Sequence, residues 1–261
     1  MPEKTIAADV QVYSADLVLS REDTTWQAAI AVATSDESLD AEAYLHPNEL
    51  RMLRGMKFDR RSQTYLLGRI AAKRAILHCT SGDHPTQIEV RAGVFGQPVC
   101  EFAAYLGYEV SISHTQNVAL AIAFPAGHQL AIDFELCSRT NEIVMKSQTT
   151  EVERNSIHLL PLEQPISYAV LWTAKEALAK VLKCGFTVPP HILAVETATM
   201  IDGATVSRFK NFSQYKSVSW VTGNFAVSVV APDKTDLSID PSRLQKWLCH
   251  TDVCKRTASR C

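Results

Sequence analysis

The sequence has no long hydrophobic run. Its most apolar stretch, VALAIAF at 118–124, is far shorter than the about 20 residues that a helix needs to cross a bilayer. The N-terminal stretch MPEKTIAADVQVYSADLVLS has no apolar segment of the length found in signal peptides. We therefore expect no membrane as a partner and a cytoplasmic location.

An excess of charge of one sign is also absent. The 26 Lys and Arg residues nearly balance the 28 Asp and Glu residues, which leaves a net charge of −2. The chain as a whole therefore has no attraction for nucleic acid or an anionic membrane, and any anion site must be local. Hydrophobic residues make up 46% of the 261 residues, which is typical of a soluble globular protein of one to two domains with a substantial core.

Cysteines are few and show no framework pattern. The seven cysteines are odd in number and scattered along the chain, which indicates reduced thiols in a cytoplasmic protein rather than a disulfide scaffold. His250 lies near Cys249, Cys254 and Cys261, but their spacing matches no zinc motif. We interpret 249–261 as a flexible tail.

The chain contains a weak internal repeat. VSISHTQNVALAIAF at 110–124 and SVSWVTGNFAVSVVA at 217–231 each read as two alternating strands joined by a turn. The two hairpins are offset by 107 residues, and the same offset places the helix-like 65–77 on 172–184; 12 of the 60 positions compared from 65 onwards are identical. Shared composition could produce part of this agreement, but the preserved order of helix, glycine turn and hairpin favours a duplication.

Two such units predict an α+β fold, in which helix-plus-antiparallel-sheet halves pack as a pseudo-twofold dimer within one monomeric chain. We place the halves at 1–128 and 129–248 and expect a ligand site in the cleft between them. The polar segment 138–170 is predicted to add helices and loops to the second half.

A pair of acids marks the stretch LAIDFE at 130–135. Period-two alternation puts Asp133 and Glu135 on one face of a strand, with Ile132 and Phe134 on the other. The plain interpretation is the exposed face of an amphipathic strand. Two adjacent carboxylates repel each other, however, and a divalent cation would relieve this repulsion, with oxygen ligands favouring Mg²⁺ or Mn²⁺.

A second motif lies in LWTAKEALAK at 171–180. Trp172, Glu176 and Lys180 recur every four residues and so share one side of a predicted helix. Alone, a Glu–Lys pair at this spacing is a common solvated feature. If the helix faces the acidic strand, Glu176 supplies a third carboxylate to the metal, and Lys180 reaches a phosphate oxygen.

The third motif is SISH at 111–114. A histidine directly before a turn can donate to a phosphate from either nitrogen when protonated, and the Ser113 hydroxyl can donate as well. A histidine at a strand end is more often structural. Beside a phosphate site, we interpret His114 and Ser113 as ligands.

Together these motifs resemble the 4′-phosphopantetheinyl transferase superfamily, in its longer, two-copy form typified by surfactin-synthetase activators. The resemblance extends from about His46 to Val230 and rests on SISH, IDFE at 132–135 and LWTAKEALAK. It implies a pseudo-twofold α+β fold and an enzyme of the holo-carrier-protein synthase type. The reaction implied is Mg²⁺-dependent transfer of phosphopantetheine from coenzyme A to a serine of an acyl or peptidyl carrier protein, with release of 3′,5′-ADP.

The resemblance also implies roles for individual residues. Asp133, Glu135 and Glu176 correspond to the metal-binding acids, with Glu176 the favoured general base. Lys180 corresponds to the basic residue at the pyrophosphate, and His114 to the histidine that holds a coenzyme A phosphate. The nucleotide end is expected at first-half residues, namely Arg69, Lys73 and Gln97.

Three positions depart from the family pattern. Gln97, in FGQP at 95–98, stands where a phosphate-binding lysine is common, Lys73 where arginine is frequent, and Ala131 where glycine is usual. We expect these changes to weaken coenzyme A binding, whereas the acids and Lys180 are all present.

Two other functions fit the same residues. A metal-dependent nuclease or phosphatase would use the carboxylates and the lysine for hydrolysis without coenzyme A. A non-catalytic homologue would bind coenzyme A or a carrier protein without transferring anything.

Overall fold

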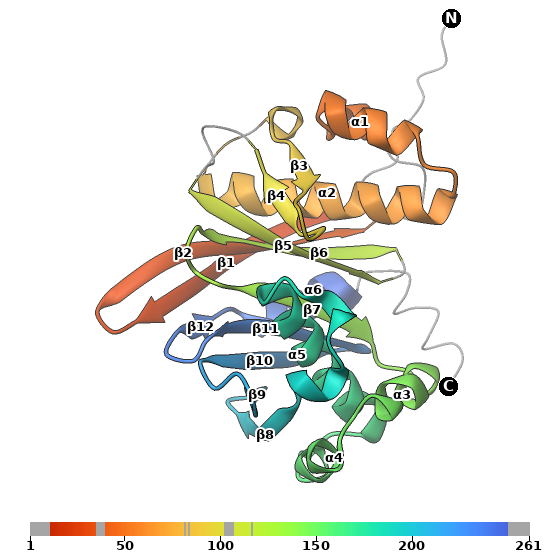
Figure 1. The fold of residues 1–261 in the computed structure, drawn as a ribbon. Helices are drawn as coiled ribbons and strands as arrows, with labels where there is room; N and C mark the ends of the chain where they lie inside the picture. Colours follow the sequence, from red (N-terminus) through yellow and green to blue (C-terminus); the bar gives the residue numbers. More distant parts are fainter. Residues whose placement is uncertain are drawn as a thin grey trace, which may run out of the picture.

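The computed structural model describes residues 11–34, 40–80, 82, 84–101, 107–115 and 117–249. They form two five-stranded antiparallel sheets, a separate two-stranded hairpin and six α-helices (Figure 1). This mixture of helices and antiparallel sheets confirms the predicted α+β class. No helix in the described residues is long and apolar enough to cross a membrane. The predicted tail lies outside the described residues from position 250 onwards.

The first sheet has the strand order β12-β1-β2-β6-β5. Its strands are β1 (Gln11–Arg21), β2 (Thr24–Thr34), β5 (Tyr108–Thr115), β6 (Val118–Pro125) and β12 (Asp236–Ser238). The helices and the hairpin of this half are α1 (Pro47–Arg54), α2 (Asp59–Thr80), β3 (Val90–Ala92) and β4 (Pro98–Cys100). Because β12 pairs with β1, a strand that follows the second sheet in sequence completes the first sheet.

The second sheet has the order β7-β11-β10-β9-β8. Its strands are β7 (Ala131–Leu136), β8 (Val195–Ile201), β9 (Ala204–Phe209), β10 (Tyr215–Thr222) and β11 (Phe225–Pro232). The helices that follow β7 are α3 (Arg139–Ser147), α4 (Glu151–Ile157) and α5 (Gln164–Val181), and α6 (Pro241–Cys249) ends the described chain. The helices predicted within 138–170 are therefore present.

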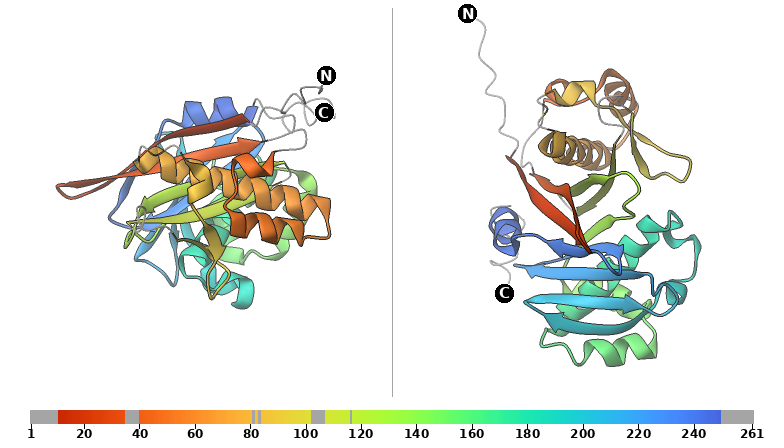
Figure 2. Two further views of the ribbon diagram at one scale, coloured as in Figure 1. Left: turned by 90° about the horizontal axis from the view of Figure 1, so that it is seen from above. Right: turned by 90° about the vertical axis from the view of Figure 1, so that its left-hand side faces the viewer.

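The two sheets are stacked between helices. The central core lies between the sheets and is closed by α6, whereas α2 packs on the outer face of the first sheet and α5 on that of the second (Figure 2). Strand β6 shows how the sequence produces this order. Leu120, Ile122 and Phe124 enter the central core, and the alternate alanines face α2, where their small side chains let the helix approach closely.

The predicted hairpins are confirmed, whereas the helix bounds differ: α2 extends beyond 65–77 at both ends, and α5 begins before 172. Strands β5 and β6, shifted by 107 residues, match the bounds of β10 and β11. Helix α5 ends at Val181, before the predicted 184, because Lys183 adopts a left-handed conformation (φ 55°) that stops the helix. A duplication as the origin of the two halves stays a prediction.

Candidate active site

Asp133 is at the centre of the candidate site. Its side chain is buried on β7, and Oδ1 accepts hydrogen bonds from the Ser113 hydroxyl at 2.6 Å and from the Lys180 ammonium at 2.7 Å. The other oxygen, Oδ2, is also buried and has no hydrogen-bond partner among the described residues. Such an oxygen costs free energy unless a donor or a cation satisfies it.

Helix α5 brings Glu176 and Lys180 to this carboxylate. The helix has Pro165 in its first turn, where the missing N–H breaks no bond. Its buried face is rich in alanine, so the helix lies close to the sheet that carries Asp133. Glu176 and Lys180 are half-buried at the margin of this face.

The charges at the site are strongly coupled. Burial and then the charge of Asp133 raise the pKa of Glu176 to about 8, although Lys180 acts in the opposite direction. Burial and Asp133 also raise the pKa of Glu135. The Trp172 side chain is hydrogen-bonded to Glu176. The helix face that carries Trp172, Glu176 and Lys180 is therefore part of the site. Glu176 and Lys180 are not a solvent-exposed ion pair on the protein surface.

The three acids suit a hard divalent cation by their chemistry. Carboxylates favour Mg²⁺ or Mn²⁺, Asp133 Oδ2 lacks a partner, and the raised pKa values reflect burial together with an excess of negative charge. In the part of the chain that the structure describes, no group of three His, Cys, Asp or Glu side chains is arranged to hold a metal ion. Ligation by all three acids therefore requires side-chain rotation.

The raised pKa of Glu176 predicts how stability depends on pH without metal. Between the ordinary pKa of 4.5 and about 8, the folded protein holds a proton that the unfolded chain releases. Stability therefore falls as pH rises through this range. In EDTA, we expect Tm to fall by several degrees from pH 5 to 8, and to fall less in a Glu176→Gln variant, measured by differential scanning calorimetry. Identical slopes for the two proteins would contradict the raised pKa.

Arg69 and His114 line one cavity of about 370 Å³, together with Tyr65 and Pro98. The Arg69 guanidinium lies 4.5 Å from the centre of the Tyr65 ring, and its Nε forms an ion pair with Glu49 Oε1 at 3.7 Å. His114 is exposed at one edge, and its pKa is lowered by partial burial and then by Lys180. A further cavity of about 640 Å³ is lined by both His114 and Glu135. The structure thus brings these predicted ligands close to the acids.

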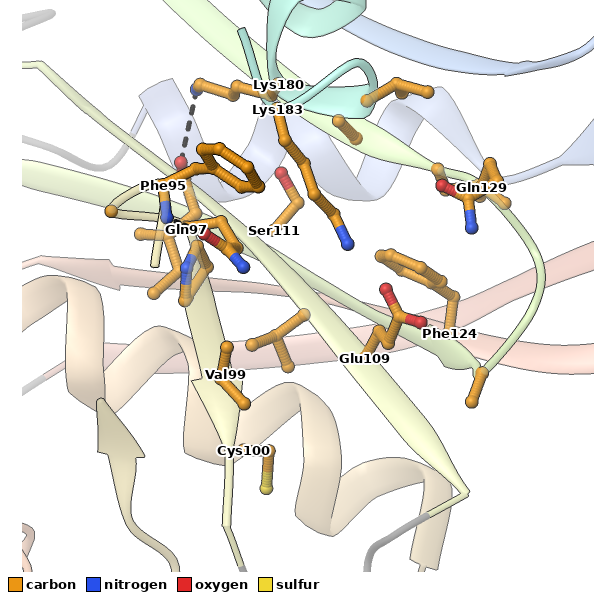
Figure 3. Close-up of a pocket in the computed structure, with 18 of the residues that line it drawn as sticks. Phe95, Gln97, Val99, Cys100, Glu109, Ser111, Phe124, Gln129, Lys180 and Lys183 are labelled. Carbon is orange, nitrogen blue, oxygen red and sulfur yellow. Dashed lines mark hydrogen bonds between the residues drawn. The ribbon is translucent and has the colours of Figure 1, made fainter. Parts of the chain in front are cut away.

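Gln97 and Ser113 are engaged within the protein. Gln97 borders a cavity of about 540 Å³ that is also lined by Lys180 and Lys183 (Figure 3). Its side-chain oxygen accepts from the Phe95 N–H at 2.9 Å, so the side chain supports its own turn. Ser113 lines none of these three cavities, and its hydroxyl donates a hydrogen bond to Asp133.

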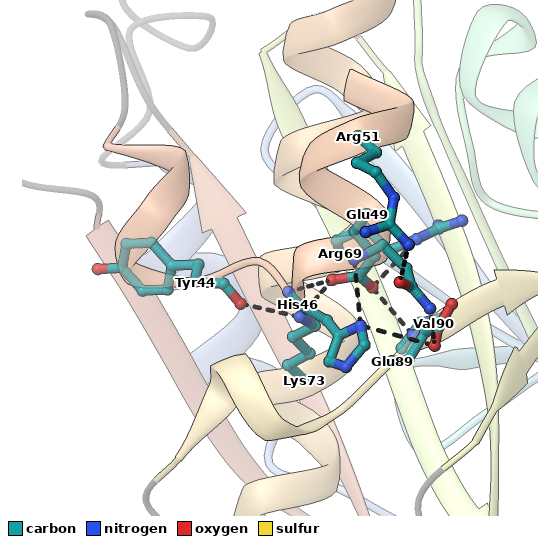
Figure 4. Close-up of polar contacts among 9 residues, drawn as sticks. Tyr44, His46, Glu49, Arg51, Arg69, Lys73, Glu89 and Val90 are labelled. Atoms are coloured by element: carbon teal, nitrogen blue, oxygen red, sulfur yellow. Dashed lines mark hydrogen bonds and ion pairs between the residues drawn. The ribbon is translucent and has the colours of Figure 1, made fainter. Parts of the chain in front are cut away.

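Lys73 is not brought to the site. Its ammonium is buried, paired with Glu49, and bonded to the Tyr44 carbonyl at 2.8 Å (Figure 4). Glu49 also accepts from the backbone N–H groups of His46 at 2.8 Å and Val90 at 2.9 Å. We call this arrangement the Glu49 clamp. It joins α1, α2 and β3, and Lys73 lines none of the three cavities described above.

The second half contains the same arrangement, the Glu153 clamp. Lys175 is paired with Glu153 at 3.0 Å and bonded to the Gln148 carbonyl at 2.9 Å. Glu153 also accepts from the N–H groups of Thr150 at 2.7 Å and Val195 at 3.1 Å. By its contacts Lys73 therefore corresponds to Lys175, whereas the offset of 107 pairs it with Lys180. Neither clamp was predicted from the sequence, although Thr150-x-x-Glu153 is a recognisable capping box.

One comparison with known proteins covers part of this region of the chain. A model of the 4′-phosphopantetheinyl transferase superfamily matches residues 129–230, which include the three acids and Lys180. No curated protein matches the chain. The likeness to this superfamily therefore covers residues 129–230 of the 261-residue chain.

Proposed function

We propose that the protein transfers 4′-phosphopantetheine from coenzyme A to a serine of an apo carrier protein and releases 3′,5′-ADP, with Mg²⁺ as cofactor. One observation carries the proposal. Inside the matched domain, Lys180, Glu176 and Glu135 surround the buried Asp133, whose Oδ2 has no partner among the described residues.

Asp133, Glu135 and Glu176 would hold the metal. When bound, Mg²⁺ supplies positive charge at the pyrophosphate of coenzyme A. In the reaction the serine Oγ forms a bond to the β-phosphorus, and the bond from this phosphorus to the oxygen of 3′,5′-ADP breaks. Glu176 would act as the general base that takes the serine proton. Lys180 neutralises charge that develops on the leaving phosphate.

The nucleotide end of coenzyme A is proposed to lie in the cavity of Arg69 and His114. Their cationic and hydrogen-bonding groups suit phosphate, and Arg69 is held at this cavity by its ion pair with Glu49. Gln97 adds no charge and is bonded to its own turn, which supports weaker binding at that point. Lys73, held by Glu49, is proposed to have a structural role.

Mass spectrometry of an apo carrier protein tests the proposal directly. Incubation with this protein, coenzyme A and Mg²⁺ is expected to add one phosphopantetheine group to the carrier, and EDTA is expected to prevent the addition. Binding of coenzyme A without transfer to any of several carriers would indicate the non-catalytic homologue. Phosphate-ester hydrolysis without coenzyme A would indicate the nuclease or phosphatase.

A further inference from the structure

The two sheets meet where β5 and β7 lie side by side. Each is the outermost strand of its sheet, and the two strands contact each other. We call this line of contact the seam. An edge strand has backbone N–H and C=O groups that no neighbouring strand pairs with. Where these groups are buried, they need other partners.

Hydroxyl groups of β5 satisfy the N–H groups of β7. Ile132 N donates to Ser111 Oγ at 3.1 Å, and Phe134 N donates to Ser113 Oγ at 3.3 Å. Both serine side chains are buried. The two bonds advance by two residues along each strand, so the strands run parallel. Each hydroxyl stands where a neighbouring strand would place a carbonyl.

Lys180 satisfies the carbonyl groups at the same place. Its ammonium donates to Ile112 O, in the first sheet, at 3.1 Å and to Ile132 O, in the second sheet, at 3.0 Å. Its third bond goes to Asp133. An ammonium has three donors, so all three are used at the seam.

The β5 hydroxyl groups also contact the acids. Residues 111, 113 and 115 point to the same face of the strand. Ser113 donates to Asp133 Oδ1, and Thr115 donates to Glu135 Oε2 at 3.4 Å. In the hydrogen bonds given above, Ser111 binds only the backbone of Ile132. The Ser113 proton engages one Asp133 oxygen and leaves Oδ2 for another partner.

We propose that Ser111 and Ser113 are positioning residues that close the seam in place of a strand ladder, and that Ser113 in addition fixes the orientation of Asp133. The second part rests on the proposed function, because it assigns Asp133 to a metal. The first part concerns the fold alone and is tested without substrate.

Two alanine variants separate these parts. Ser111→Ala removes a seam acceptor without touching an acid, so it is the matched control for Ser113→Ala. We expect hydrogen exchange to accelerate about tenfold at the Ile132 amide in Ser111→Ala and at the Phe134 amide in Ser113→Ala. Mn²⁺ affinity, measured by calorimetry without coenzyme A, should fall about 10- to 100-fold in Ser113→Ala only. Ser113→Thr keeps a hydroxyl and should retain most of that affinity.

A third variant, Ser207→Ala, removes a buried hydroxyl that has no hydrogen-bond partner within the described parts of the chain and should change neither measurement. If the Ile132 and Phe134 amides exchange at native rates in both seam variants, the two serines do not close the seam. Faster exchange with native Mn²⁺ affinity in Ser113→Ala would retain the seam and overturn the orientation of Asp133. A native protein that transfers no phosphopantetheine while the exchange results hold would refute the proposed function and leave the seam intact.

Discussion

A Glu176→Gln variant is expected to lose two to four orders of magnitude in kcat for phosphopantetheine transfer. The substitution keeps the size of the side chain and removes the group that accepts the serine proton, and loss of a general base costs roughly 10²- to 10⁴-fold. It also removes one of three neighbouring acidic groups, so the metal-free variant should be at least as stable as the native protein at pH 8, where Glu176 of the native protein ionises beside Asp133.

The measurement is steady-state transfer at saturating coenzyme A and Mg²⁺, with Tm determined in parallel. Glu196→Gln is the matched control, because Glu196 is exposed on β8 and forms no part of the proposed site. It should leave kcat unchanged. Near-native turnover in Glu176→Gln would exclude Glu176 as the base.

The second large effect is expected on stability, at the Glu153 clamp. Lys175→Met leaves the carboxylate of Glu153, which is 0% exposed, without its counter-ion. Breaking a buried ion pair from one side costs about 3–5 kcal/mol, and in a protein of this size this corresponds to a fall in Tm of roughly 10 °C. The double variant Glu153→Gln/Lys175→Met buries no unpaired charge and should recover part of the loss. A double variant less stable than Lys175→Met would contradict the ion-pair explanation.

The Glu49 clamp provides a matched test of Lys73. Lys73→Met should lower Tm by a similar amount and leave KM for coenzyme A within about twofold at a temperature where the variant is folded. Arg69→Met should raise KM about tenfold or more, since it removes a charged hydrogen-bond donor from the proposed nucleotide cavity. It should lower Tm less than Lys73→Met does, because Arg69 is the more distant partner of Glu49 and Lys73 remains as the counter-ion. A large rise in KM for Lys73→Met, with little change in Tm, would return Lys73 to the ligand set.

Local periodicity predicted the centre of the site from the sequence. Alternation in 130–135 fixes the face on which Asp133 and Glu135 lie, and helical spacing fixes that of Glu176 and Lys180. Each of these two patterns is formed by residues only a few positions apart in the sequence. The sequence could therefore place these four side chains on two faces, and the resemblance to a family indicated that the faces meet.

The roles of Lys73 and Ser113 could not be predicted in the same way. Lys73 faces a buried partner and not a ligand because it pairs with Glu49, which is distant from it in sequence. The capping box that contains Glu49 was hard to recognise, because its N-cap residue is a histidine and not a serine or threonine. Ser113 lies on an edge strand, and its role depends on which strand of the other sheet approaches it. Alternation along β5 could have revealed the row of hydroxyls, but not that it faces backbone N–H groups of β7.

The pairing of β12 with β1 affects how the protein can be made. Val18 pairs with Ser238, so a ribosome must synthesise almost the whole described chain before the outer edge of β1 gains its partner. Until then the nascent first sheet exposes backbone groups that can pair with other chains. A fragment that stops at residue 128 would keep this edge open permanently, and we expect it to aggregate when expressed alone.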